Sequence, residues 1–101
     1  MNLPHLHYDR DGEPISALEW AHLFEDRVYR RVAETTLSNG RWVSTVWLGL
    51  NHGDSRHLLI FETMVFPSEG DRGELDCDRY ATQDEAIAGH EAMCAKWSEP
   101  H

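Results

Sequence analysis

Residues 42–50 read WVSTVWLGL and residues 58–66 read LLIFETMVF, and these two apolar stretches decide the fold. Each is short and rich in β-branched and aromatic residues, so each predicts a β-strand. In the first stretch both alternating sets of side chains are largely apolar, which is typical of a central strand covered on both faces. In the second stretch a carboxylate, Glu62, stands in the middle of one set. Pro67 ends that strand because proline cannot donate a ladder hydrogen bond.

Two further segments extend this pair into a meander. Residues 29–37 are rich in β-branched residues, and Ser38-Asn39-Gly40 is a turn signal that joins them to the strand at 42–50 as a hairpin. A short fourth strand is expected around 77–81, after an acidic stretch with turn residues. The sequence therefore predicts about four consecutive antiparallel strands.

Two helices flank the strands. Ser16 with Glu19, and Thr82 with Glu85, have the capping-box spacing that predicts a helix start. After Ser16 the apolar residues recur at helical spacing as far as Val28, and the second helix is expected to run to about Trp97.

The expected fold class is α+β, with the antiparallel meander carrying both helices on one face. A chain of 101 residues of which 41% are hydrophobic supports one core, so residues 1–101 are predicted to form a single domain. An uncovered second sheet face carrying a Trp, Ile60, Met64 and Phe66 is then expected to form an apolar patch.

The charge balance restricts the partners. The chain has 9 basic and 18 acidic residues and a net charge of -9, and it shows no basic stripe, so direct nucleic-acid binding is not expected. Most of the excess acid lies between residues 69 and 91. This stretch is interpreted as a solvated surface, with a docking surface for a basic partner as the alternative.

The expected setting is a reducing cytoplasm. No apolar run is long enough to span a bilayer, and the N-terminus does not have the pattern of a signal peptide. Cys77 and Cys94 are not part of a close-spaced motif, so both are predicted to be free thiols in a reducing compartment.

Motifs for catalysis are absent from the sequence. We find no nucleophile elbow and no glycine-rich phosphate loop, and we predict no catalytic residue and no cofactor. His90 and Cys94 lie one helical turn apart, but two ligands do not make a zinc site. His90 is therefore interpreted as a hydrogen-bonded histidine of the core or its rim, and no metal site is predicted.

Glu62 is the most unusual polar residue of the predicted sheet, because a carboxylate among apolar residues needs a partner or water. One interpretation is a cross-strand ion pair, with Arg31 or Arg41 as partner, or plain exposure. The alternative is a pocket with Thr45, Trp47 and Tyr80, in which Glu62 has an elevated pKa and serves binding or acid–base chemistry. The candidate binding residues are Thr45, Trp47, Glu62, Met64, Tyr80 and His90.

A resemblance covers most of the chain. It is carried by residues 12–15 (GEPI), 19–20 (EW), 23–26 (LFED), 29–33 (YRRVA), 43–50 (VSTVWLGL), 59–66 (LIFETMVF), 79–82 (RYAT), 85–86 (EA) and 89–91 (GHE). In these segments the chain resembles a family of small proteins of unknown function from actinobacterial phages and their hosts. The resemblance implies a phage or prophage setting and no particular mechanism.

Three functional hypotheses follow. The leading one is a non-enzymatic phage or prophage accessory protein that acts by protein–protein interaction, as a homodimer or on a host protein. The second is a small-molecule binding protein or enzyme with a pocket between sheet and helices, built from Glu62, Tyr80 and His90. The third is an acidic mimic of nucleic acid or inhibitor of host defence.

Overall fold

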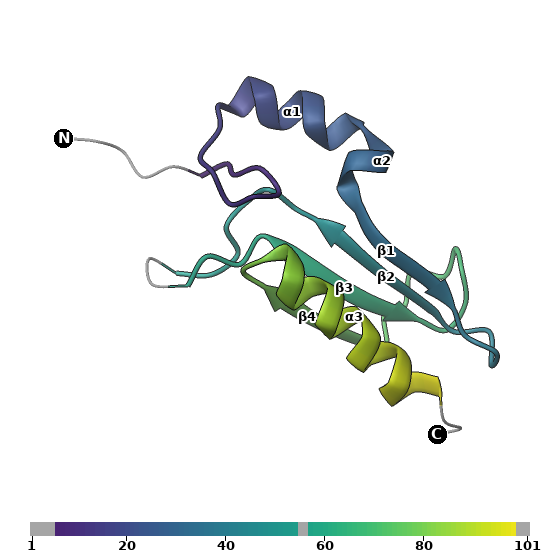
Figure 1. Cartoon of the computed structure of the whole chain (residues 1–101). Helices are drawn as coiled ribbons and strands as arrows, with labels where there is room; N and C mark the ends of the chain where they lie inside the picture. Colours follow the sequence, from purple (N-terminus) through teal and green to yellow (C-terminus); the bar gives the residue numbers. More distant parts are fainter. Residues whose placement is uncertain (1–5, 55–56, 99–101) are drawn as a thin grey trace.

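The computed structural model describes residues 6–54 and 57–98 and has the expected α+β architecture (Figure 1). In chain order the elements are α1 (Ala17–Glu25), α2 (Arg27–Arg30), β1 (Arg31–Thr36), β2 (Trp42–Trp47), β3 (Phe61–Phe66), β4 (Asp76–Tyr80) and α3 (Gln83–Ser98). The four strands form one antiparallel sheet in the order β1-β2-β3-β4, which confirms the predicted meander.

Both predicted helix starts are present. The backbone N–H of Glu19 donates to the hydroxyl of Ser16, and the N–H of Glu85 donates to the hydroxyl of Thr82. These bonds satisfy backbone donors of the first turn that have no partner within the helix.

The first helix ends earlier than predicted. We expected one helix as far as Val28, but α1 stops at Glu25 and a separate turn, α2, follows. Asp26 lies between them in an extended conformation, and its carboxylate accepts the N–H groups of Val28 and Tyr29. An aspartate that caps the next turn competes with continuation of the helix, and here it redirects the chain into β1.

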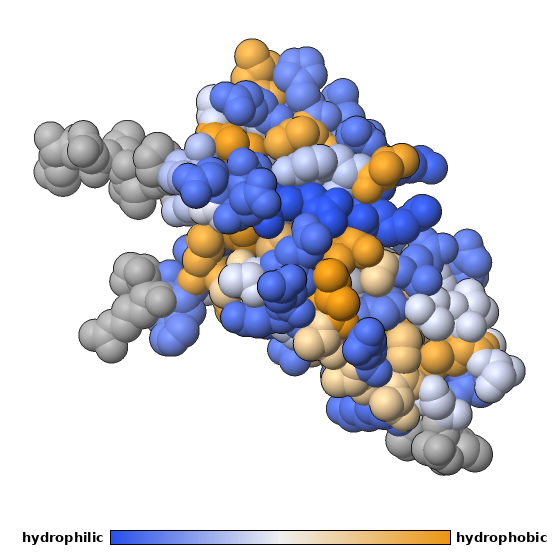
Figure 2. All heavy atoms as spheres, viewed as in Figure 1, coloured by the Kyte–Doolittle hydropathy of each residue, from blue (hydrophilic) through white to orange (hydrophobic). Residues whose placement is uncertain are grey.

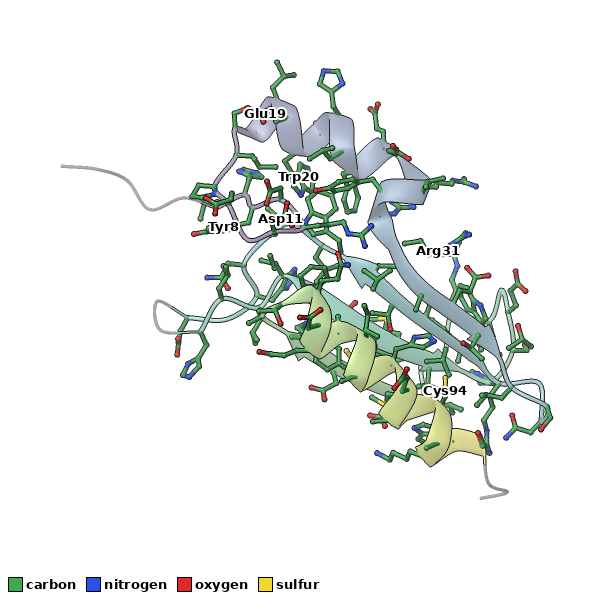
Figure 3. The ribbon with its side chains drawn as sticks, in the orientation of Figure 1. Tyr8, Asp11, Glu19, Trp20, Arg31 and Cys94 are labelled. Atoms are coloured by element: carbon green, nitrogen blue, oxygen red, sulfur yellow. The ribbon has the colours of Figure 1, made fainter. Side chains whose placement is uncertain are left out.

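The helices cover one face of the sheet. α3 packs across all four strands (Figure 1). At the end of the sheet where β2 stops, the rings of Phe24 and Tyr29 pack against Trp47, so the α1–α2 segment lies on the same face as α3. Figure 3 shows Trp20 on the inner side of α1, between that helix and the sheet. The prediction that both helices lie on one face is confirmed.

The two central strands are shorter than expected because the ladder changes at Gly49. Gly49 has a φ of 73°, and both it and Leu48 donate to the carbonyl of Ile60. Two consecutive donors on one acceptor end the regular alternation, so β2 ends at Trp47 and β3 begins at Phe61. Ile60 is consequently fully buried in the core, and our expectation that it lies on the uncovered face is wrong.

The core lies between the sheet and the helices in two clusters. The larger one is centred on Trp47, Ile60 and Phe61 and lies below α1, while the smaller one joins Val43 and Val65 to α3. Within the described residues no helix covers the other face of the sheet, and we call this face the open face. The residues of the two central strands on the open face are half-buried, except Glu62, which is buried.

Candidate functional site

The open face has an apolar centre and charged margins. Strand alternation and the cross-strand register place Trp42, Ser44 and Val46 of β2 on this face, beside Glu62, Met64 and Phe66 of β3. The apolar residues among them are half-buried, and the rings of Trp42 and Phe66 stack with centroids 5.5 Å apart. An apolar surface that no element of the fold covers is the usual mark of an interaction site.

The six candidate binding residues are divided between the two faces. Thr45, Trp47, Tyr80 and His90 lie on the helix-covered side, whereas Glu62 and Met64 belong to the open face. Strand alternation is the reason, since neighbours in a strand point to opposite faces. The predicted pocket that joins Glu62 to Thr45, Trp47 and Tyr80 is therefore not formed.

His90 is a hydrogen-bonded core histidine, as predicted. Its Nδ1 atom lies 2.7 Å from the hydroxyl of Thr45 and its Nε2 atom lies 2.9 Å from the hydroxyl of Thr35. Thr45 also bonds the hydroxyl of Thr63 at 2.5 Å, so a short polar chain crosses three strands inside the core. Burial lowers the pKa of His90, and the nearby charge of Glu91 opposes this effect.

Tyr80 of β4 is buried next to this polar chain, but its hydroxyl has no hydrogen-bond partner among the described residues. Burial raises the pKa of its hydroxyl, and Thr63 offsets part of that effect, although the geometry between the two falls short of a regular hydrogen bond. The ring lies against Gly89 of α3, where a Cβ atom would collide with it. Tyr80 and His90 are both buried between the sheet and α3, which is typical of core residues.

Glu62 has a partner, but a different one from those we considered. Its Oε2 atom lies 3.0 Å from Nε of Arg79, which stands directly opposite on β4. Neither Arg31 nor Arg41 forms this pair. Arg31 begins β1, which is not adjacent to β3, and the guanidinium of Arg41 donates to the carbonyl of Trp97 in α3. The carboxylate, in a residue only 8% exposed, is thus compensated at the margin of the open face.

Cys77 completes the open face on β4. Burial raises the pKa of its thiol to about 11, with the charge of Glu62 as a further cause. The thiolate is the nucleophile in cysteine chemistry, so a thiol with this pKa is poorly reactive at neutral pH. Cys77 and Cys94 are both free, as predicted.

A basic corner adjoins the apolar centre. Arg27 and Arg30 of α2 and Arg31 of β1, which we call the arginine corner, line a cavity of about 190 Å³. Its other walls are Glu34, Trp42, Ser44 and Val46. Figure 3 shows Arg31 at the start of β1. The cavity is smaller than the roughly 300–1,000 Å³ of ligand pockets, so it fits a single functional group rather than a whole metabolite.

The arginine corner is short of acceptors. Arg31 pairs with Glu34 at 2.9 Å, and Arg30 lies over the ring of Phe24 at 4.9 Å from its centroid. Within residues 6–54 and 57–98 neither Arg27 nor Arg30 makes an ion pair with its side chain. Guanidinium groups are donors only, so this corner favours a carboxylate or another anion.

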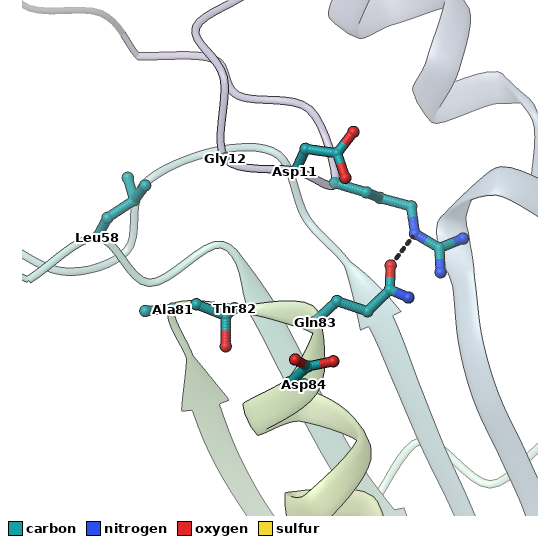
Figure 4. Close-up of a pocket in the computed structure, with 8 residues that line it drawn as sticks. Asp11, Gly12, Leu58, Ala81, Thr82, Gln83 and Asp84 are labelled. Carbon is teal, nitrogen blue, oxygen red and sulfur yellow. Dashed lines mark hydrogen bonds between the residues drawn. The ribbon is translucent and has the colours of Figure 1, made fainter.

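Shallow cavities also lie on the helix-covered side, and two of them are formed by described residues. The larger, about 420 Å³, lies at the start of α3 between Gly12, Leu58 and Thr82 (Figure 4). Arg10 bonds Gln83 across it at 2.9 Å. A second cavity of about 240 Å³ lies between β4 and α3 and reaches Tyr80 but not His90. Neither brings together the residues of the predicted small-molecule pocket.

The outer surface of the helix-covered side is mostly polar. Figure 2 shows this side, where hydrophilic residues dominate over α1, whereas over α3 hydrophilic residues lie beside a strip of apolar and weakly polar residues. The described residues contain no group of three or more His, Cys, Asp or Glu that could hold a metal ion. Among the same residues, no helix combines the length and the apolar character that crossing a bilayer requires.

Comparisons with models of protein families, with curated proteins and with solved structures found no match to this chain. The candidate site therefore rests on its own geometry.

Sequence reasoning missed the arginine corner and the role of Trp42. A signal was present, since three of the nine basic residues of an acidic chain fall within positions 27–31. What the pattern does not give is the break at Asp26, which places Arg27 and Arg30 at the corner of the sheet instead of along a continuing helix.

Proposed function

We propose that this protein acts by protein–protein interaction through the open face of its sheet, and that a second copy of the chain is the occupant. The observation that carries the proposal is the apolar centre formed by Trp42, Val46, Met64 and Phe66, which no helix in the described part of the chain covers. Domains of this class bury a sheet face against a further layer, and here the fold supplies a layer on one side only.

The size of the face fits a weak dimer. Four strands about 4.8 Å apart and six residues long give a footprint of roughly 400 Å² per copy. Two copies then bury about 800 Å² of sheet face, which is below the ~1,200 Å² at which stable interfaces begin. We therefore expect an association of micromolar strength that depends on concentration.

A weak homodimer dissociates readily, so its open face can then bind a different partner. The resemblance to phage and prophage proteins supports an accessory role in which the same face binds a host protein. The proposal assigns no reaction to the chain, because Tyr80 and His90 lie in the core, Asp76 is paired with Lys96, and the raised pKa of Cys77 keeps its thiol protonated at neutral pH.

Sedimentation equilibrium from micromolar to millimolar concentration tests the proposal. The wild-type chain should approach the mass of two copies as its concentration rises. Met64→Lys places a charge in the centre of the open face and should keep the chain monomeric over the same range. Circular dichroism should show that the variant retains its secondary structure.

Leu18→Lys is the matched control. Leu18 lies on α1 and is 71% exposed, away from the open face, so the same substitution there should leave dimerisation unchanged. A wild-type chain that stays monomeric throughout would refute the proposal. So would a Met64→Lys variant that dimerises as strongly as wild type, because the open face would then not be the interface.

A further inference from the structure

The charge of the open face differs in sign from that of the chain. Its margins and the arginine corner contain four arginines, Arg27, Arg30, Arg31 and Arg79, and two glutamates, Glu34 and Glu62. These residues sum to a local charge of +2, whereas the whole chain carries -9. Two such faces repel each other if they meet squarely, so the second copy has to present an acidic segment to the arginine corner.

The chain itself contains a segment of the required chemistry. Residues 67–75, the loop between β3 and β4, are all exposed. We call them the acidic loop because they include Glu69, Asp71 and Glu74 against one arginine, Arg72. Within the described part of the chain, the side chains of Glu69 and Glu74 form no ion pair. Leu75, at the end of the loop, is 41% exposed.

The acidic loop and the arginine corner lie at opposite ends of the sheet. The arginine corner stands where β1 begins, and β1 runs antiparallel to β2, which runs antiparallel to β3. The loop leaves from the end of β3, which is the far end of the sheet from the start of β1. A second copy turned end over end about a two-fold axis therefore brings each loop towards the other copy's arginine corner.

We propose that the arginine corner is the binding site for the acidic loop of a second copy, and that Glu69 and Glu74 supply the carboxylates. This inference rests on the proposed function, since it requires that the open face binds another copy. The small cavity takes one carboxylate at a time, and Arg27 and Arg30 gain the acceptors that their own chain does not provide. The exposed side chain of Leu75 adds apolar contact at the margin of the face.

A charge-swap experiment tests the inference. One variant carries Arg27→Glu and Arg30→Glu, and the other carries Glu69→Arg and Glu74→Arg. Alone, each variant has like charges at both contacts of its homodimer, so each should dimerise at least about tenfold more weakly than wild type. Mixed together, the two variants have opposite charges at both contacts, and a heterodimer should form with an affinity near that of wild type.

The control pair replaces the loop substitutions by Asp84→Arg and Glu91→Arg, two exposed acidic positions on α3. Mixed with the Arg27→Glu, Arg30→Glu variant, this chain should show no preference for the heterodimer. Native mass spectrometry of the mixtures reads the species directly, and the weakening of the wild-type dimer by salt provides a second readout.

The outcomes separate the two proposals. If wild type dimerises, Met64→Lys abolishes the dimer, and the charge-swapped chains do not prefer each other, the loop contact is wrong while the open face remains the interface. Equal heterodimer formation with the control pair also overturns the loop contact, because any added positive charge would then suffice. A monomeric wild type overturns both.

Discussion

The Nδ1 atom of His90 lies 2.7 Å from the hydroxyl oxygen of Thr45, and this bond holds α3 to the middle of the sheet. The other ring nitrogen bonds Thr35 on β1. A neutral imidazole has one donor and one acceptor nitrogen, and hydroxyl groups serve either role, so the neutral ring satisfies both contacts. A protonated ring would place a charge in a residue that is only 5% exposed.

Folding stability should therefore fall as the solution becomes acidic. Burial lowers the pKa of His90 below its ordinary value of 6.5. Between the two pKa values the unfolded chain binds a proton that the folded chain does not, so this contribution is complete above pH 6.5 and is lost as the pH decreases through that window. Urea unfolding at a series of pH values from about 8 to about 5 measures the slope.

The His90→Gln variant isolates the cause. Its amide retains a donor and an acceptor but does not titrate, so its stability should depend less on pH over the same window even though the variant is less stable overall. An unchanged slope in this variant would assign the pH dependence to other groups.

Gly49 should be among the least replaceable residues of the chain. It has a φ of 73°, and a Cβ atom there would collide with the rings of Trp20 and Trp47. Gly49→Ala combines backbone strain with overpacking and should cost about 2–4 kcal/mol. Gly40 is the matched control, because it has a φ of 89° with open space around it, and Gly40→Ala should cost only about 1 kcal/mol. Equal losses in thermal unfolding would contradict the collision.

The meander could be predicted from sequence because each strand carries its own signal. The runs around Trp47 and Phe61 are too long and too apolar for an exposed loop, so they predict strands. The turn at Asn39-Gly40 predicts the hairpin that joins β1 to β2. The capping pairs mark helix starts for a local reason, since the bond spans three residues. These features depend on neighbours in sequence, and the structure retains them.

The candidate site could be predicted only in part because it depends on which face a residue takes. Glu62 and Tyr80 look equally placed in the sequence, but they occupy positions of opposite alternation and so lie on opposite faces. Ile60 lies in the core and not on the open face, because the carbonyl of Ile60 accepts two hydrogen bonds, from Leu48 and Gly49, and the strand alternation changes there. The arginine corner depends on Asp26, which caps α2 and so ends α1. The spacing of apolar residues continues through this position, so it gives no sign that the helix ends there.

The ion pair of Glu62 and Arg79 should contribute to folding stability mainly because Arg79 neutralises a carboxylate that is nearly buried, and less through the attraction between the two charges. Arg79→Met leaves a nearly buried carboxylate without its partner and should cost about 1–2 kcal/mol, reduced by the partial exposure of the arginine. Adding Glu62→Gln removes the charge, and the double variant should be more stable than Arg79→Met alone. Chemical denaturation of the three proteins measures the difference. If the double variant is less stable than Arg79→Met alone, neutralisation of the Glu62 carboxylate is not the main contribution that the substitution removes, and the prediction is wrong.

Two of the tryptophans should differ in how much stability the same substitution costs. The indole N–H of Trp47 donates to the carbonyl of Tyr8 at 3.0 Å, and the side chain is fully buried. Trp47→Phe loses that bond and part of the core and should cost about 2–3 kcal/mol. The indole N–H of Trp42 is buried with no acceptor among the described residues, so Trp42→Phe removes an unsatisfied donor and keeps the stacking on Phe66.

Trp42→Phe should therefore change the free energy of unfolding by less than about 1 kcal/mol. The same variant tests the open face, since a Phe retains most of the apolar surface and dimerisation should persist. A loss of stability as large as that of Trp47→Phe would mean that the Trp42 indole is held by a contact that the fold does not otherwise reveal, and the open face would then be more firmly packed than its half-buried side chains indicate.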